Sequence, residues 1–224
     1  MSVRKGEPWG WRSESPADSV VVGDDRALAA AVEERVGSRR VGWEPVAGAD
    51  FARAVGATGA ARAPGTEGMD LPCDALRVTA RGEEHLAVNM VVAGTPPDRQ
   101  HRFTRSAHLR VVVDGNEVHA GPATAVVVAN GQFLRGADVV PRGHPGDGRA
   151  EVQVYAVRGS QRASMRARLG GGEHVPHPDI RQVTGRRIEL ETARRWPLEV
   201  DGAAAAPALR VLVEVRPAEF VLVT

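Results

Sequence analysis

The segment from Ala125 to Val157 constrains the fold more than any other part of the chain. An apolar run ends at Asn130-Gly131, a loop rich in Gly and Pro follows, and residues 151–155 then alternate between polar and apolar side chains. Apolar or alternating runs that are bounded by Gly, Pro, Asn and Asp are typical of β-strands. The sequence therefore predicts a strand on each side of a long loop.

Strand-like runs continue from His85 to the end of the chain. They cover residues 85–92, 108–113, 123–129, 151–157, 186–191, 197–200, 208–215 and 219–223. Asp114-Gly115-Asn116 is a turn signal between two such runs. Ser160 to Leu169 has the composition of a helix, which three consecutive glycines end. The sequence therefore predicts a mainly β domain over residues 85–224.

The earlier part of the chain is predicted to form a small α/β lobe over residues 18–84. Apolar residues recur at helical spacing between Arg26 and Val36, and Asp24 or Asp25 is the candidate N-cap of this helix. The other predicted segments are an arm over 1–17, strands over 19–22 and 41–46, a short helix over 50–55 and an exposed connector over 57–69.

Composition excludes several classes of protein. The net charge of +1 argues against a nucleic-acid-binding protein. Lys5 is the only lysine, so the body of the chain has no lysine for a P-loop or a Schiff base. Cys73 is the only cysteine, which excludes an intrachain disulfide and a Cys-based zinc site. No apolar run reaches the length of a membrane span, so we expect a cytoplasmic protein with at most peripheral membrane contact.

Short motifs in the β-rich part resemble the C-terminal domain of the diacylglycerol kinase and sphingosine kinase family of lipid kinases. Their order and spacing agree with the family from about residue 85 to residue 224. The motifs are Val88-Asn89, Val128 to Gly131, Pro141 to Val154, Gly172 to Pro178 and Val200-Asp201-Gly202. The resemblance implies an N-terminal α/β nucleotide-binding-like lobe followed by a C-terminal β-sandwich-like domain, as in the lipid kinase and NAD kinase-like superfamily.

The N-terminal part resembles the nucleotide-binding lobe of the same family more faintly. Val20 to Ala27 is similar to the family's first phosphate loop, and Pro45 to Gly56 to its second. By this resemblance the nucleotide-binding residues are Gly23, Asp24, Asp25, Gly48 and Asp50.

The departures from the family pattern predict a degenerate nucleotide site. Loop glycines let backbone N–H groups approach phosphates closely, but Asp24 and Arg26 replace two of them here. A second carboxylate beside phosphate oxygens would repel them. Ala27 replaces the loop threonine, and the second loop is shorter and lacks its Thr and Asn. Roughly the first βαβ unit of the family is also missing, so we expect a reduced lobe.

Asp201 is the candidate catalytic residue. In the family, the aspartate of this motif is assigned as the general base that accepts the proton of the alcohol. The alternative is a hairpin turn, because Asp-Gly between two strands is common turn chemistry. Ala203 stands where the family has a glutamate.

Asp147 is the candidate metal ligand. The family's counterpart loop helps to bind a structural Mg²⁺ and usually has two consecutive acids, whereas this chain has one. The alternative is again a loop turn. His174 and His177 are too poorly placed for a zinc site, because the prolines around them disfavour a helix that would align the two rings.

Other polar and aromatic residues have plainer explanations. Asn89 and Asn130 are expected to satisfy backbone groups at strand ends. Several arginines could form a rim for phosphate or anionic headgroups, although solvated side chains are the commoner explanation; they are Arg105, Arg110, Arg135, Arg142 and Arg149. Trp43, Phe51, Trp196 and Phe220 are expected in the core or at a domain edge.

Three functions are compatible with this sequence. The first is a lipid kinase-like protein that has lost ATP-dependent phosphotransfer and binds a lipid, a membrane surface or a protein partner without a cofactor. The second is an active kinase that uses ATP and Mg²⁺ to phosphorylate a diacylglycerol-like or sphingoid alcohol, with Asp201 as base. The third is a subunit, in a homodimer or with a co-encoded chain, whose partner supplies the missing α/β half.

Overall fold

One sheet of 13 strands holds most of the chain together, with a two-stranded sheet, β10–β11, beside it. The computed structural model describes residues 9–34, 39–57, 59, 61, 63, 65–170 and 177–224. The strands are β1 (Trp11–Ser13), β2 (Ser19–Gly23), β3 (Arg40–Pro45), β4 (Gly68–Ala80), β5 (Glu83–Ala87), β6 (Met90–Gly94), β7 (Ala107–Val113), β8 (Asn116–Ala123), β9 (Ala125–Ala129), β10 (Phe133–Leu134), β11 (Ala137–Asp138), β12 (Ala150–Tyr155), β13 (Ile180–Gly185), β14 (Arg187–Val200) and β15 (Ala203–Val223). The helices are α1 (Asp25–Glu33), α2 (Asp50–Val55) and α3 (Arg162–Gly170), with 3-10 turns η1 (Pro97–Arg99) and η2 (Gly159–Gln161).

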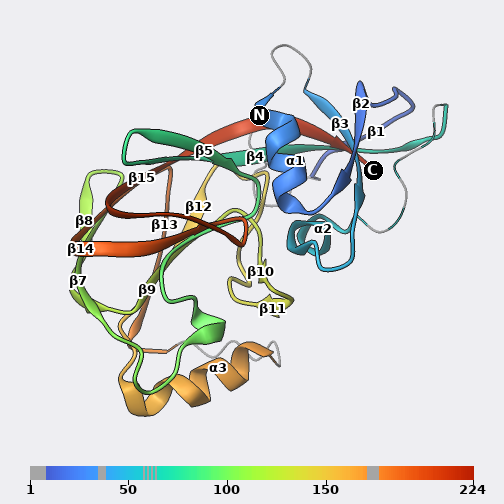
Figure 1. The fold of residues 1–224 in the computed structure, drawn as a ribbon. Helices are drawn as coiled ribbons and strands as arrows, with labels where there is room; N and C mark the ends of the chain where they lie inside the picture. The colour runs from blue at the N-terminus through green and yellow to red at the C-terminus, as the bar shows by residue number, and fades with distance from the viewer. Residues whose placement is uncertain are drawn as a thin grey trace.

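Strand β15 connects the two halves of the molecule. It pairs antiparallel with β14 and β4 along the β-rich half and then runs parallel to β3 at its C-terminal end. Figure 1 shows it arching from the β14 hairpin to the region of α1 and β3. The predicted boundary between residues 84 and 85 falls within β5, and the division of the chain into domains stays a prediction.

The β-rich half curls into two layers around one core. Side chains from β4, β7, β14 and β15 and from β6, β9 and β12 belong to the same buried apolar cluster. A second cluster lies under α1 and α2 and contains Trp43, Phe51 and Phe220, and a third lies under α3. Trp196 is buried in the first cluster, so the prediction of core positions for these four aromatic residues is confirmed. The β-sandwich-like fold class is also confirmed.

Four hairpins share the same two-residue turn, in which a glycine follows a residue with positive φ. The turns are Arg81-Gly82, Asp114-Gly115, Arg135-Gly136 and Asp201-Gly202. Positive φ at both central residues is the geometry that matches the twist of the flanking strands, and it favours glycine at the second position. The predicted turn at Asp114 is therefore confirmed, and Asp201 does lie in a hairpin turn.

The local predictions for the N-terminal part agree closely with the structure. Asp24 is the N-cap of α1, and its carboxylate accepts a hydrogen bond from the N–H of Ala27. The predicted helix over 50–55 is α2, and Gly56 ends it in the left-handed conformation. Trp9 anchors the N-terminal arm, because its Nε1 donates to the carbonyl of Pro72 at 3.0 Å.

Several strands differ from the sequence prediction. Six strands were not predicted, namely β1 within the expected arm, β4, β8, β10, β11 and β13. The strand expected over 85–92 is divided into β5 and β6. β4 contains Asp70, Pro72 and Asp74, which resemble turn residues in the sequence. In the fold, Asp70 pairs with Arg40, and the Asp74 carboxylate accepts the N–H groups of Gly148 and Ala218. These contacts are long-range, so no local pattern reveals them.

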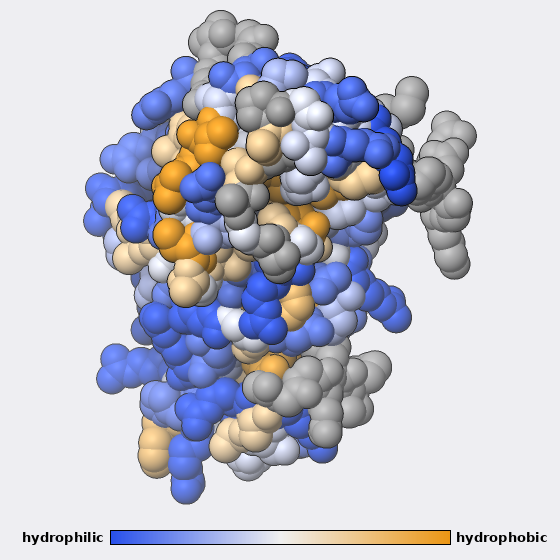
Figure 2. Space-filling model, turned by 90° about the vertical axis from the view of Figure 1, so that its right-hand side faces the viewer, coloured by the Kyte–Doolittle hydropathy of each residue, from blue (hydrophilic) through white to orange (hydrophobic). Residues whose placement is uncertain are grey.

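Strand β2 is the outer strand of the parallel β2–β3 pair. Among the described residues it pairs with β3 alone, and Val20 and Val22 are 52% and 66% exposed. Figure 2 shows orange side chains gathered in the upper part of this face of the molecule, above a mainly blue lower part. No helix of the described residues is long and apolar enough to cross a membrane.

Candidate functional site

The carboxylate of Asp201 is held by three backbone N–H groups. Oδ1 accepts from the N–H of Asn89 at 3.0 Å and of Met90 at 2.8 Å, and Oδ2 accepts from the N–H of Val88 at 2.8 Å. These donors lie between β5 and β6, which explains why the predicted strand over 85–92 is interrupted. The β14–β15 turn is thus tied to a loop more than 100 residues earlier in the chain.

Asn89 connects Asp201 to Asp25 at the start of α1. Its Nδ2 donates to Oδ2 of Asp25 and to the carbonyl of Phe133, both at 3.1 Å. A Cβ on Gly131 would lie 2.3 Å from Asn89 Oδ1, so the residue after Asn130 must be glycine for this side chain to fit. Asn130 satisfies backbone groups as predicted, because its Nδ2 donates to the carbonyls of Asp74 and Val88. Asn89 was predicted to do only this, and its bridging role was missed.

The two linked carboxyl groups are both buried and close enough to repel each other when charged. Burial raises the pKa of Asp25 to about 7, with a further contribution from the charge of Asp201, while the N–H of Phe51 opposes the shift. Burial also raises the pKa of Asp201 to about 6, against the effect of its three N–H donors. Nearby like charges and loss of water both favour the neutral form of an acid. The protein therefore takes up protons here near neutral pH.

Hydrogen bonds of Asp50 join helix α2 to the β10–β11 hairpin. The Asp50 carboxylate accepts the N–H groups of Arg135 and of Gly136, the latter at 2.7 Å. Arg53 donates to the carbonyl of Gly136 at 3.0 Å and lies over the ring of Phe133 at 4.5 Å. The carboxylates of Asp25 and Asp50 thus bind backbone N–H groups of the protein itself.

A cleft of about 260 Å³ opens between α1 and the β14–β15 turn. Asp201 contributes to its wall from the turn, Arg26 and Glu33 from α1, and His85 from β5. Arg26 and His85 had no predicted role as site residues. Arg26, which follows the turn at residues 23–25, thus lines one cleft with Asp201, while Asp25 reaches Asp201 only through Asn89. The charged and titratable lining groups of the cleft are two acids, Glu33 and Asp201, and two basic side chains, Arg26 and His85.

The two glycines predicted for nucleotide binding differ in their surroundings. The carbonyl of Gly23 accepts from Trp43 Nε1 at 3.1 Å, and a Cβ at Gly23 would lie 2.5 Å from that of Ala27. Gly48 has φ of +91° and open space where a side chain would begin. Gly23 is thus packed into the protein, and only Gly48 leaves room beside its backbone.

The acids of this site do not form a metal-binding set. No group of three His, Cys, Asp or Glu residues in the described parts of the chain is arranged to hold a metal ion. Asp147 Oδ1 accepts the N–H of Arg149 at 2.9 Å, which is a turn contact. His174 lies outside the described residues, and His177 Nδ1 accepts the N–H of Asp179. A metal role for Asp147 stays a prediction.

The arginines considered as a rim are distributed over separate elements. Arg110 pairs with Glu117, and Arg149 donates to the carbonyl of Thr184. Arg135 is the one nearest the site: it pairs with Asp98 at 2.7 Å and with Glu199 at 2.9 Å, and these carboxylates raise its pKa. Its charge is therefore already neutralised.

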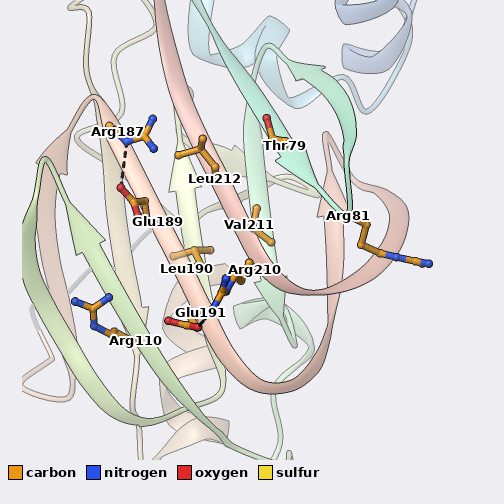
Figure 3. Close-up of a pocket in the computed structure, with 10 residues that line it drawn as sticks. All are labelled: Thr79, Arg81, Arg110, Arg187, Glu189, Leu190, Glu191, Arg210, Val211 and Leu212. Atoms are coloured by element: carbon orange, nitrogen blue, oxygen red, sulfur yellow. Dashed lines mark hydrogen bonds and ion pairs between the residues drawn. The ribbon is translucent and has the colours of Figure 1, made fainter.

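A second hollow, of about 380 Å³, lies over β4, β15 and β14 (Figure 3). Its charged side chains are mostly paired with each other: Arg187 with Glu189 at 3.1 Å, and Arg210 with Glu191 at 2.8 Å. Arg81 points away from the others. A surface whose opposite charges neutralise each other has little field left for a charged ligand.

The stability of the protein is expected to fall as the pH rises from 5 to 8. Asp25 and Asp201 bind protons more tightly in the folded state than in the unfolded chain, so their favourable contribution is lost as the pH passes through about 6 to 7. Urea unfolding should show a decrease of about 2–4 kcal/mol. Asp25→Asn, which mimics the protonated acid, should flatten this dependence. An unchanged slope in Asp25→Asn would show that these acids are not the cause.

Residues 99–224 match the model of the YegS C-terminal NAD kinase β-sandwich-like domain, and this range is more than half of the chain. The chain belongs to this family. The YegS-type domain begins at the end of η1 and includes α3, the Asp201 turn and all of β15. The family suggested by the sequence motifs is thereby confirmed.

Solved structures with the same fold include diacylglycerol kinase-like proteins. A protein from Bacillus anthracis strain Sterne that is proposed to be a diacylglycerol kinase has a TM-score of 0.73 and 18% identity, over 92% of this chain and 78% of that one. A structure described as a diacylglycerol kinase from the same strain has a TM-score of 0.67 and 17% identity, over 92% of this chain and 76% of that one. No curated protein matches the sequence. At these identities the likeness concerns the fold.

Proposed function

We propose that this YegS-family protein binds lipid without transferring phosphate from ATP. The proposal rests on one observation. The acids predicted for the nucleotide and catalytic sites accept hydrogen bonds from backbone N–H groups of the protein itself. Asp25 accepts the N–H of Phe51, and Asp50 accepts those of Arg135 and Gly136. Asp201 accepts three N–H groups at the start of β6. The Asp50 contacts, and the contact of Asp25 with Asn89, join the two predicted lobes, while the other contacts lie within one lobe. A kinase would instead present donors to phosphates here.

Electrostatics supports the same conclusion. Asp24, Asp25 and Asp50 gather at the predicted phosphate loops, and Asp201 lies within electrostatic reach of Asp24 and Asp25. A triphosphate in the cleft would meet the carboxyl groups of Glu33 and Asp201, with Arg26 as the one arginine of the lining. Phosphoryl transfer depends on positive groups that neutralise the phosphates, so the residues present fit ATP poorly.

A thermal-shift experiment with the full chain tests this proposal. We expect millimolar ATP with Mg²⁺ to leave the melting temperature unchanged, because a ligand stabilises only the protein that binds it. Short-chain diacylglycerol should raise it. A lipid-dependent phosphate transfer would overturn the proposal, and a diacylglycerol kinase of the same fold serves as the positive control.

An active kinase is the second candidate, and Asp201 is the observation that favours it. Three N–H donors leave one lone pair of its carboxylate free, and Asp201 lines the cleft with its pKa raised to about 6. A carboxylate with these properties is suited to accept a proton from an alcohol at neutral pH. In this case Asp201→Asn, folded by circular dichroism, would lose all lipid-dependent turnover.

A partner chain is supported by the exposed strand β2. Among the described residues β2 pairs with β3 alone, and Val20 and Val22 are exposed on one face of it. An unpaired strand edge is a common place for a strand of another chain to add. Light scattering of the purified protein, alone and with any co-encoded chain, measures this directly.

A further inference from the structure

The lower end of the molecule in Figure 1 is formed by α3 and the loop after η1. We call residues 100–106 the Phe103 loop. Arg162 holds this loop through its Nη1, which donates to the carbonyl of Thr104, while Nε donates to the carbonyl of Val157. Arg166 donates to the carbonyl of Gln100 at 3.3 Å. Hydrogen bonds from two arginines of α3 therefore hold the loop against that helix.

An aromatic ring projects from this loop into solvent. Phe103 is 74% exposed, which is the highest value among the exposed large apolar side chains of the described residues. The N–H of Phe103 donates to His101 Nδ1, and the N–H of His101 donates to Thr104 Oγ1. These hydrogen bonds hold the backbone on either side of Phe103 in place. An exposed aromatic ring on a firm backbone costs solvation free energy unless something covers it.

Four arginines lie in the Phe103 loop or in the segments that contact its backbone. The guanidinium of Arg102 lies 4.8 Å from the ring centroid, and Arg105 is exposed two residues further on. A Cβ at Gly159 would lie 2.6 Å from the carbonyl oxygen of Arg102, which brings the exposed side chain of Arg158 to the same end. Arg166 adds a fourth charge from α3.

Few acids oppose these charges. Within the part of the chain that the structure describes, no carboxylate pairs with Arg102 or Arg105, and Arg158 has only a 3.9 Å contact with Asp179. Asp98, the acid of η1, is already bound by Arg135. The net charge of the whole protein is only +1, so the positive charge at this end comes from the clustering of its arginines.

We propose that the Phe103 loop and the adjoining arginines dock the protein on an anionic lipid membrane, with the Phe103 ring inserted among the headgroups. A projecting aromatic side chain next to several arginines suits a lipid interface, where apolar area is buried and basic side chains meet phosphates. The inference rests on the proposed lipid-binding function for the choice of partner. It needs neither ATP nor a bound lipid substrate.

The loop is also connected to the candidate site. Arg99, at the end of η1, pairs with Glu199 at 3.2 Å, and Arg135 pairs with the same carboxylate. Glu199 precedes Asp201 by two residues on β14. The turn η1, which leads into the Phe103 loop, is thus joined to the strand that carries the Asp201 turn.

Vesicle sedimentation of the full chain tests the proposal. We expect binding to vesicles of phosphatidylcholine with about 30% phosphatidylglycerol and about tenfold weaker binding to pure phosphatidylcholine. Arg102→Glu with Arg105→Glu should weaken binding at least tenfold. Arg12→Glu with Arg81→Glu is the control, because both pairs change the net charge from +1 to −3 by two reversals each. Equal losses in the two double variants would overturn the docking site.

A second readout follows the ring itself. In Phe103→Trp, brominated lipids should quench the added fluorescence, and the wild-type protein, with its four tryptophans, measures the background. Phe103→Ser should weaken vesicle binding several-fold while circular dichroism stays unchanged. Absence of quenching, or binding to a soluble polyanion as tight as to vesicles, would indicate another partner and overturn the proposal. These measurements contain no ATP. A negative result would therefore reject the docking surface without changing the result of the thermal-shift experiment, which tests the proposed function.

Discussion

Replacing Asp201 with alanine is expected to lower the free energy of unfolding by about 3 kcal/mol, because three backbone N–H groups lose their acceptor. The N–H groups of Val88, Asn89 and Met90 lie where β5 gives way to β6, and Asp201 is 8% exposed, so water cannot fully replace the carboxylate. Urea unfolding at pH 7 measures the difference.

Two further variants separate the causes of this loss. Asp201→Asn keeps the oxygen that serves Asn89 and Met90 and turns an NH₂ group toward Val88, so it should cost less than alanine. Arg81→Ala removes a side chain from the same position of a similar turn. The φ angle is 56° at Arg81 and 45° at Asp201. This control measures the cost of alanine at positive φ. If Asp201→Ala cost no more than Arg81→Ala, the three hydrogen bonds would contribute nothing.

Replacing Phe51 with alanine is expected to cost about 3–5 kcal/mol, because it leaves a cavity in the centre of the N-terminal core. Phe51 is fully buried, and its ring lies 6.2 Å from that of Trp43 and 6.4 Å from that of Phe220. These three rings come from α2, β3 and β15, so the side chain joins elements of both halves. Urea unfolding followed by tryptophan fluorescence also reports the environment of Trp43.

Phe103→Ala is the matched control for this substitution. The same atoms are removed, but the ring of Phe103 is 74% exposed and forms no part of a core. Its effect should stay within about 0.5 kcal/mol of the wild-type value. Similar losses in the two variants would contradict the burial described here and would also remove the basis for the Phe103 loop as a docking surface.

The division of the two longest strands in the prediction has one physical cause. The sequence predicted separate strands over 186–191 and 197–200 and over 208–215 and 219–223, whereas β14 and β15 are continuous. Pro197 and Pro217 lie inside these strands and lack an N–H for the ladder. Register shifts between Glu191 and Leu198 and between Arg216 and Phe220 accommodate them. Such bulges depend on the partner strand, which a local pattern does not contain.

The sequence by itself determined the features that neighbouring residues decide: the Asp24 cap of α1, the limits of α2, the Asp114 turn and the motifs of the YegS family. Only the tertiary structure decided what the acids of the site bind. Asp201 finds its donors 111 to 113 residues earlier in the chain, and Asp25 meets Asn89 across 64 residues. A buried carboxylate must be satisfied by whatever groups the fold brings to it, and contacts over such separations arise from packing and not from local sequence.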